Sequence, residues 1–140
     1  MKIKVYLNES RDSFRGFDYK NARLREAAEF DLDAELPRLN LSEAGSLEAF
    51  EAFQKTKEDA ALAVLEGIFT QLNVGGDLYP AEDYTVAYRE AGNRSLSVGD
   101  VVTLDGAAYA VGRFGWDRVL AAGVSLSVRR YERLGEEVLW

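Results

Sequence analysis

The side chains that could do chemistry in this sequence are carboxylates, hydroxyls, phenols and cations, because the chain has no histidine and no cysteine. It therefore lacks the usual general base near neutral pH, a common metal ligand and any thiol. The best remaining constellation for acid–base catalysis is Asp100, Asp105 and Tyr109, with Arg113 close by in the sequence. Two carboxylates can act as acid and base when their surroundings separate their pKa values. Both aspartates also have a structural use in turns, so we expect a protein that is not an enzyme, with no catalytic residue and no cofactor.

The most specific stretch is RSLSVGDVV, residues 94–102. Gly99 permits a backbone angle that other residues avoid, Asp100 can accept hydrogen bonds from nearby backbone amides, and the two valines can enter a buried strand. This pattern predicts a turn that leads into a sheet. The alternative is a polar ligand site lined by Ser95, Ser97 and Asp100. A phosphate-binding loop is not indicated, because the GxxxxGK[ST] motif is absent.

Oxygen ligands at Asp31, Asp33 and Glu35 have the early spacing of a calcium-binding EF-hand loop. The glycine and the terminal glutamate that such a loop requires are missing. Alternating acids on the exposed face of a strand explain the pattern better, so we predict no metal site.

Negative charge is concentrated in the middle of the chain. The protein has 17 basic and 24 acidic residues, a net charge of −7, and residues 26–66 hold 11 acidic and 3 basic residues. Binding to double-stranded nucleic acid is therefore not expected, because it requires cations that displace counterions from phosphates. The carboxylates of Glu48, Glu51, Glu58 and Asp59 are either a solvated helix face or an acidic face that docks a host or element-encoded protein.

A single-stranded nucleic acid is the alternative partner, because arginines and aromatic residues alternate near the C-terminus. Such side chains can stack on bases and contact phosphates. The residues are Arg113, Phe114, Trp116, Arg118, Arg129, Arg130, Tyr131 and Arg133.

A long amphipathic helix is predicted from Ser46, which can serve as the N-cap, to a stop at Asn73 and the Gly75-Gly76 pair. Its apolar residues recur at helical spacing and should form one buried face. They are Leu47, Phe50, Phe53, Ala61, Leu65, Ile68 and Leu72.

Strands are predicted on both sides of this helix. Residues 2–7 alternate strictly, and residues 24–33 form an antiparallel partner in which Glu26 breaks the alternation; a short helix over 21–29 is the rival interpretation. Residues 84–88 have strand spacing, although Glu82-Asp83 could begin a helical turn. Residues 101–111 form a hairpin around Asp105-Gly106, followed by an apolar segment at 116–120 and a last strand within 124–134.

These elements predict one α+β domain over residues 1–140. The long amphipathic helix packs on an antiparallel, partly barrel-like sheet built largely from the C-terminal half. The expected core residues are Phe53, Ile68, Phe69, Tyr109, Phe114 and Trp116.

Two segments resemble the YodL-like domains found in accessory proteins of plasmids, conjugative elements and related bacterial mobile DNA. The segments are Leu-Glu-Gly-Ile-Phe-Thr-Gln-Leu-Asn at 65–73, and RSLSVGDVV followed by Tyr109, Val111, Gly115-Trp116 and Val119. The resemblance covers about residues 62–120, departs from the pattern between Val74 and Asn93, and has Trp116 where phenylalanine is usual. It implies a small mobile-element protein and supplies no catalytic residue.

We therefore expect a non-catalytic, protein-binding accessory factor of a plasmid, conjugative element or phage. The specific hypothesis is an anti-defence or antirestriction factor whose acidic face imitates DNA phosphates toward a host nuclease or effector. The start of the chain lacks a signal-peptide h-region, and no apolar run approaches the roughly 20 residues that cross a bilayer. We expect a cytoplasmic protein with no membrane partner; a structural domain without such a role is the remaining alternative.

Overall fold

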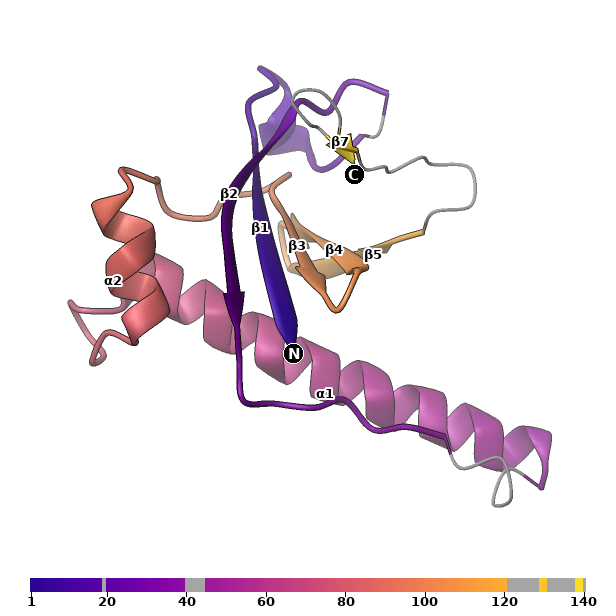
Figure 1. The fold of residues 1–140 in the computed structure, drawn as a ribbon. Coiled ribbons are helices and arrows are strands. Elements are labelled where there is room, and N and C mark those ends of the chain that lie inside the picture. Colours follow the sequence, from indigo (N-terminus) through magenta and orange to yellow (C-terminus); the bar gives the residue numbers. More distant parts are fainter. Residues whose placement is uncertain (19, 40–44, 121–128, 131–137, 140) are drawn as a thin grey trace.

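The computed structural model describes residues 1–18, 20–39, 45–120, 129–130 and 138–139. One long helix lies across a sheet of five strands (Figure 1). The elements in chain order are β1 (Lys2–Asn8), the 3-10 helix η1 (Ser13–Arg15), β2 (Leu24–Asp31), α1 (Leu47–Val74), α2 (Asp83–Glu90), β3 (Val101–Leu104), β4 (Ala107–Gly112), β5 (Gly115–Val119), β6 (Arg129–Arg130) and β7 (Val138–Leu139).

The five-stranded sheet has the order β2-β1-β3-β4-β5, and every neighbouring pair is antiparallel. β6 and β7 pair separately. The predicted α+β class is confirmed, but the sheet is not closed into a barrel, because β2 and β5 stand at its opposite edges. Three of the five strands, β3 to β5, come from the C-terminal half, as predicted, and the N-terminal strand β1 lies in the interior of the sheet between β2 and β3.

Helix α1 begins and ends where its capping residues predict. Ser46 is extended, and its side-chain oxygen accepts a hydrogen bond from the backbone N–H of Ala49 (3.0 Å). At the other end, Gly75 leaves the helix and its N–H donates to the carbonyl of Gln71 (2.9 Å). Both ends therefore follow from local sequence.

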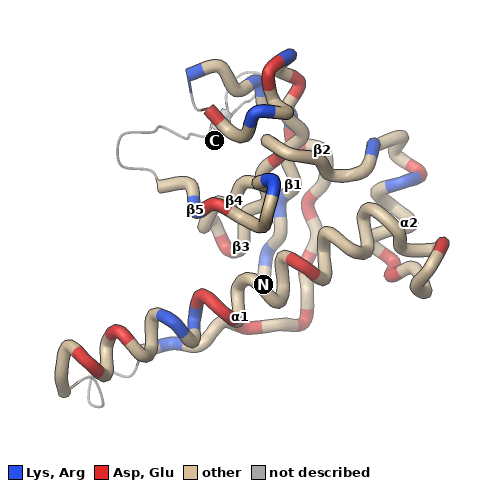
Figure 2. Tube along the Cα trace, turned by 180° about the vertical axis from the view of Figure 1, so that it is seen from behind, with Lys and Arg blue, Asp and Glu red and all other residues tan. Residues whose placement is uncertain are grey.

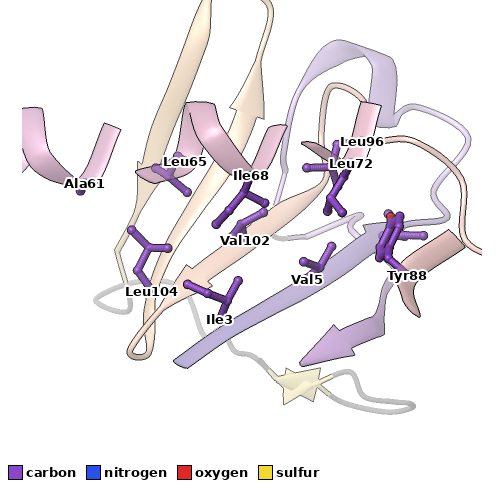
Figure 3. Close-up of a cluster of buried hydrophobic side chains, with 11 residues drawn as sticks. Ile3, Val5, Ala61, Leu65, Ile68, Leu72, Tyr88, Leu96, Val102 and Leu104 are labelled. Atoms are coloured by element: carbon purple, nitrogen blue, oxygen red, sulfur yellow. The ribbon is translucent and has the colours of Figure 1, made fainter. Parts of the chain in front are cut away.

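The main core lies between α1 and one face of the sheet (Figure 3). Ala61, Leu65, Ile68 and Leu72 are the buried residues of α1, and their spacing places them on one helix face. They pack with apolar residues of β1 and β3, namely Ile3, Val5, Leu7, Val102 and Leu104. The other face of the sheet carries a smaller cluster around Tyr6, Val101 and Ala110, against which Phe17 of the β1–β2 connection packs.

The first three turns of α1 extend beyond the sheet (Figure 1). We call residues 47–59 the arm. Leu47 and Phe50 were predicted to lie on the buried face, yet they are 72% and 41% exposed, and Phe53 is half-buried. A helix of 28 residues is about 42 Å long, which exceeds the span of strands of four to eight residues. The apolar stripe therefore continues past the sheet that covers it.

β2 contains a bulge that explains the break in its sequence pattern. Val5 pairs with Ala28 and Tyr6 with Glu26, so Ala27 is the extra residue. One added residue moves all later side chains to the other face. Leu24 accordingly packs in the smaller cluster, whereas Phe30 packs against the main core. The prediction of a strand here is confirmed, and the rival helix over 21–29 is wrong.

Residues 83–90 form helix α2, which settles the assignment left open by the sequence. Tyr84 and Tyr88 lie one turn apart on the helix. Tyr84 stacks on Phe30 of β2, with ring centroids 4.3 Å apart, and Tyr88 is buried in the core. Val86 is 43% exposed, whereas a strand would have placed it beside the two tyrosines.

The predicted core residues have mixed outcomes. Ile68 is fully buried, and Phe53, Phe69, Tyr109 and Trp116 are half-buried. The prediction that Phe114 is a core residue is wrong, because Phe114 lies at the tip of the β4–β5 hairpin and is fully exposed. Of the predicted last strand, only Arg129–Arg130 is described, as β6; the rest lies outside the described residues. Within the described ranges, none of the helices has the length and apolarity needed to span a membrane.

Candidate functional site

The stretch singled out by the sequence forms a buried cluster around Asp100. Its carboxylate has no exposed surface. Arg94 donates to both oxygens, from Nη1 to Oδ2 (2.7 Å) and from Nη2 to Oδ1 (2.9 Å). The backbone N–H groups of Asn8 and Ser97 donate to Oδ1 (2.7 Å) and Oδ2 (2.8 Å) respectively. We call these four residues the Asp100 cluster.

Asn8 joins this cluster to the end of β1. Its side-chain amide donates to the carbonyl of Gly99 (3.0 Å), and its side-chain oxygen accepts from the N–H groups of Ser10 and Arg23 (3.0 and 3.2 Å). The carbonyl of Asn8 accepts from Arg94 Nη2 (3.2 Å). The end of β1 and the turn at residues 94–100 therefore meet at one carboxylate, and Asn8 ties Arg23 to the same place.

The electrostatics of Asp100 combine opposing effects. Burial raises the pKa of this carboxyl, while Arg94 and the amides of Asn8 and Ser97 act to lower it. A carboxylate offers about four acceptor positions, and here four donors occupy them. The ionised form fits this geometry, because a protonated carboxyl would give up one acceptor position.

Both the backbone angle and the surroundings of position 99 require a glycine there. Its φ is +94°, and a Cβ on it would lie 2.5 Å from the carbonyl oxygen of Ser13 in η1. The next residue closes the turn, because the N–H of Asp100 donates to the carbonyl of Ser97 (3.0 Å) and its carbonyl accepts from Val111 (2.8 Å). The predicted turn into a strand is confirmed.

The alternative site of Ser95, Ser97 and Asp100 is only partly assembled. Ser97 lies beside Asp100, and its hydroxyl accepts from Arg94 Nη1 (3.3 Å). Ser95 is exposed, and its backbone carbonyl, not its hydroxyl, accepts from Arg94 (2.9 Å). These contacts stabilise the turn and leave no lone pair of Asp100 directed at a ligand.

The structure does not bring the acid–base candidates together. Asp100 precedes β3 and Asp105 follows it, so the whole strand separates them. Asp105 Oδ1 accepts from the backbone N–H of Lys2 (2.7 Å). Tyr109 lies in β4 under the guanidinium of Arg118, and Arg113 is at the exposed hairpin tip.

The predicted acidic residues all lie on the arm (Figure 2). Glu48, Glu51, Glu58 and Asp59 are exposed. Asp59 is 3.8 Å from Lys55, one helical turn away, which neutralises part of its charge. At 100° per residue, the four carboxylates occupy a sector about 100° wide. Glu66 extends this sector toward the sheet, where it accepts from Trp116 Nε1 (2.9 Å).

Only some of the residues predicted to bind single-stranded nucleic acid are exposed and without intramolecular contacts among the described residues. Arg118 donates to the carbonyls of Ala108 and Val119, and Trp116 packs edge-on against Phe69. Arg113 and Phe114 are exposed at the hairpin tip. Tyr131 and Arg133 lie outside the described residues, as do the side chains of Arg129 and Arg130.

The residues with EF-hand-like spacing, Asp31, Asp33 and Glu35, are exposed; Asp31 ends β2 and the other two follow it. Across the part of the chain that is described, no three acidic residues gather in a way that could hold a metal ion.

Sequence reasoning missed Arg94 and Asn8, the partners that allow Asp100 to be buried. The sequence did contain an indication for Arg94, because this cation stands in the same short stretch as an aspartate predicted to lie in a turn. The sequence contained no indication for Asn8, since the contact between Asn8 and Asp100 spans 92 residues. No protein-family model, curated protein or solved structure matches this chain.

Proposed function

We propose that this protein is a non-catalytic accessory factor of a mobile genetic element, and that it acts by binding another protein through the acidic sector of its arm. The observation that carries the proposal is the exposure of the arm. Glu48, Glu51, Glu58 and Asp59 stand on a helix segment that extends past the sheet. Lys55 lies in the same sector and pairs with Asp59, so the sector keeps an excess of negative charge and is not purely acidic. A projecting surface with such an excess speeds association with an oppositely charged partner.

The geometry around the other carboxylates favours a binding role over catalysis. The buried carboxylate of Asp100 is saturated by four donors, and Asp105 is held by the amide of Lys2. Neither is placed to exchange protons with a substrate. The mobile-element context comes from the resemblance of residues 62–120 to YodL-like domains. Within that context, the specific hypothesis is inhibition of a host nuclease or effector by an acidic surface that imitates DNA phosphates.

Charge reversal tests the docking face. The four arm carboxylates are replaced by lysine, and binding to proteins of a host lysate, including its nucleases, is compared with that of the wild type. A matched control reverses four exposed carboxylates elsewhere: Glu26, Asp33, Asp77 and Glu90. Both variants change the net charge from −7 to +1, because each replacement adds two positive charges. Loss of a partner only in the arm variant supports the proposal, whereas equal retention in both variants contradicts it.

Single-stranded nucleic acid binding is the second candidate, and the exposure of Phe114 beside Arg113 favours it. An aromatic side chain at an exposed hairpin tip can stack on an unpaired base. The test is a titration of the full chain with oligothymidylate at low and high salt. This candidate requires binding that weakens with salt and is reduced in Phe114→Ala. Binding without a salt dependence would indicate that no phosphate is contacted.

A further inference from the structure

A groove runs along the flank of α1 that faces α2. It has a volume of about 550 Å³ and lies between the C-terminal half of α1, the residue that follows β2 and the turn that leads into α2. Its lining is mostly apolar or aromatic and includes Leu32, Val64, Gly67, Tyr79, Glu82 and Tyr84. We propose that this groove binds an arginine side chain of a partner protein, with the guanidinium held by Glu82 and the two tyrosines.

Gly67 is a glycine that the fold itself does not require. It lies in the interior of α1, where glycine is less favourable than alanine. Its φ is not positive, and a Cβ placed on it would enter open space, with no neighbouring atom within 4 Å. Neither the backbone conformation nor packing within the chain therefore explains the glycine. An occupant of the groove explains it, because a larger side chain at this position would take up the space.

The groove also contains polar groups that have no partner among the described residues. The carboxylate of Glu82 makes no hydrogen bond or ion pair there, and neither does the hydroxyl of Tyr84, whose ring stacks on Phe30. Burial and then the nearby charge of Glu82 raise the pKa of the Tyr84 phenol, so the two groups are close together. A guanidinium has five donors in a planar fork and can donate to both oxygens at once. It can also bind the half-exposed ring of Tyr79 by a cation–π contact.

The charges around the groove favour a cationic ligand. Of the described residues that line it, Glu66 and Glu82 are acidic and none is basic. Glu66 already accepts from Trp116 Nε1 (2.9 Å), so Glu82 supplies the charge that a ligand can use. Residues 77–90 carry four carboxylates and one cation, Arg89, which does not line the groove. A cationic side chain therefore meets an excess of negative charge there.

The turn beside the groove indicates that the arginine belongs to a polypeptide. Leu78 and Tyr79 are 78% and 53% exposed, although the turn that carries them is firmly held. The side chain of Gln71 donates to the carbonyl of Pro80 (2.9 Å) and accepts from the N–H of Glu82 (3.0 Å). An exposed apolar pair on a rigid turn can contact the residues that flank an arginine with little loss of conformational entropy.

The first experiment titrates the full-length chain with two short peptides and follows its amide signals by NMR. The probe is a blocked leucine–arginine–leucine peptide. The matched control has citrulline in place of arginine, because citrulline has nearly the same shape and no charge. We expect only the arginine peptide to shift the signals of Gly67, Tyr79 and Tyr84. Equal binding of the two peptides, or no shift with either, overturns the proposal.

The second experiment separates binding from folding. Gly67→Leu should fill the groove and abolish binding of the arginine peptide, while the thermal stability is retained or raised, because an interior glycine is removed. Glu82→Gln should weaken binding by at least about fivefold, since a charge-assisted hydrogen bond is lost. Glu90→Gln, in α2 and outside the groove, is its matched control. Unchanged binding in Gly67→Leu, or equal effects of the two glutamine variants, contradicts the proposed site.

A third measurement distinguishes a protein partner from a small cation. N-acetylarginine amide lacks the flanking leucines and should bind about tenfold more weakly than the peptide, because less apolar surface is buried. Leu78→Ser should weaken binding of the peptide and leave that of the small compound unchanged. Equal affinities of the two ligands would assign the groove to free guanidinium compounds and overturn the docking of a protein. The groove contains no residue of the arm, so these outcomes are independent of the partner binding proposed above.

Discussion

Arg94 and Asp100 form a two-point ion pair, with N–O distances of 2.7 and 2.9 Å, between a fully buried carboxylate and a guanidinium whose side chain is 45% exposed. Loss of one partner from such a pair leaves a buried charge uncompensated. We expect Arg94→Gln to lower the free energy of unfolding by about 3 kcal/mol. Urea denaturation followed by circular dichroism measures this. A loss no larger than that of an exposed control such as Arg113→Gln would show that the pair contributes little.

The loss of stability in this variant should depend on pH. Burial raises the pKa of Asp100, and without Arg94 this pKa should rise further. A carboxyl with a raised pKa in the folded state destabilises the fold when it ionises, so stability is lost as the pH rises through that pKa. Arg94→Gln should therefore regain stability relative to the wild type as the pH falls. A difference between the two proteins that does not change with pH would contradict this.

Gly99 is predicted to be far less replaceable than Gly106. Both have positive φ, +94° and +89°, but only a Cβ on Gly99 meets another segment, 2.5 Å from the carbonyl oxygen of Ser13. Gly106→Ala should cost about 1 kcal/mol for its backbone angle. Gly99→Ala should cost at least about 2 kcal/mol, because η1 must also move. Thermal unfolding of the two variants gives the comparison, and equal costs would show that the contact with Ser13 is easily relieved.

Tyr88 predicts a loss of stability in alkali. Burial raises its pKa from 10.0 to about 12, and its hydroxyl donates to the carbonyl of Arg94 (2.6 Å). Its contribution is therefore fully present below pH 10 and is lost as the pH rises through about 12. Ultraviolet titration should show Tyr88 ionising late together with Tyr84, whose pKa burial also raises. Tyr88→Phe should reduce the amplitude of the late step, and an unchanged late amplitude in this variant would contradict the assignment.

Asn93 is predicted to stabilise the bulge in β2. Its side-chain amide donates to the carbonyl of Ala27, the bulged residue, and to that of Tyr88 in α2 (3.2 Å each). Asn93→Ala should lower the free energy of unfolding by about 1–2 kcal/mol, because both carbonyls lose a donor. Amide hydrogen exchange in Asn93→Ala, compared with the wild type, should be accelerated more in β2 than in β4. Uniform acceleration of both strands would indicate a global effect.

The sequence alone determined the features that depend on neighbouring residues. Ser46 begins α1 because a side-chain oxygen can accept from the N–H three residues later, and Gly75 ends it. Asp105-Gly106 forms the β3–β4 turn, and Gly99 adopts the positive φ that only glycine adopts readily. Each is decided within a few residues of chain, where local sterics and hydrogen bonding are sufficient.

The tertiary structure alone decided where these elements end up and what they cover. The interior position of β1 and the bulge at Ala27 are features of the pairing of β1 with β2 and β3. Helix α2 places Tyr84 on Phe30 of β2 and buries Tyr88 in the core. The burial of Asp100 depends on Asn8 and Arg94, and the exposure of Leu47 on a sheet shorter than α1. These outcomes are set by contacts between segments distant in sequence, so an apolar or charged residue acquires its role only when the chain has folded around it.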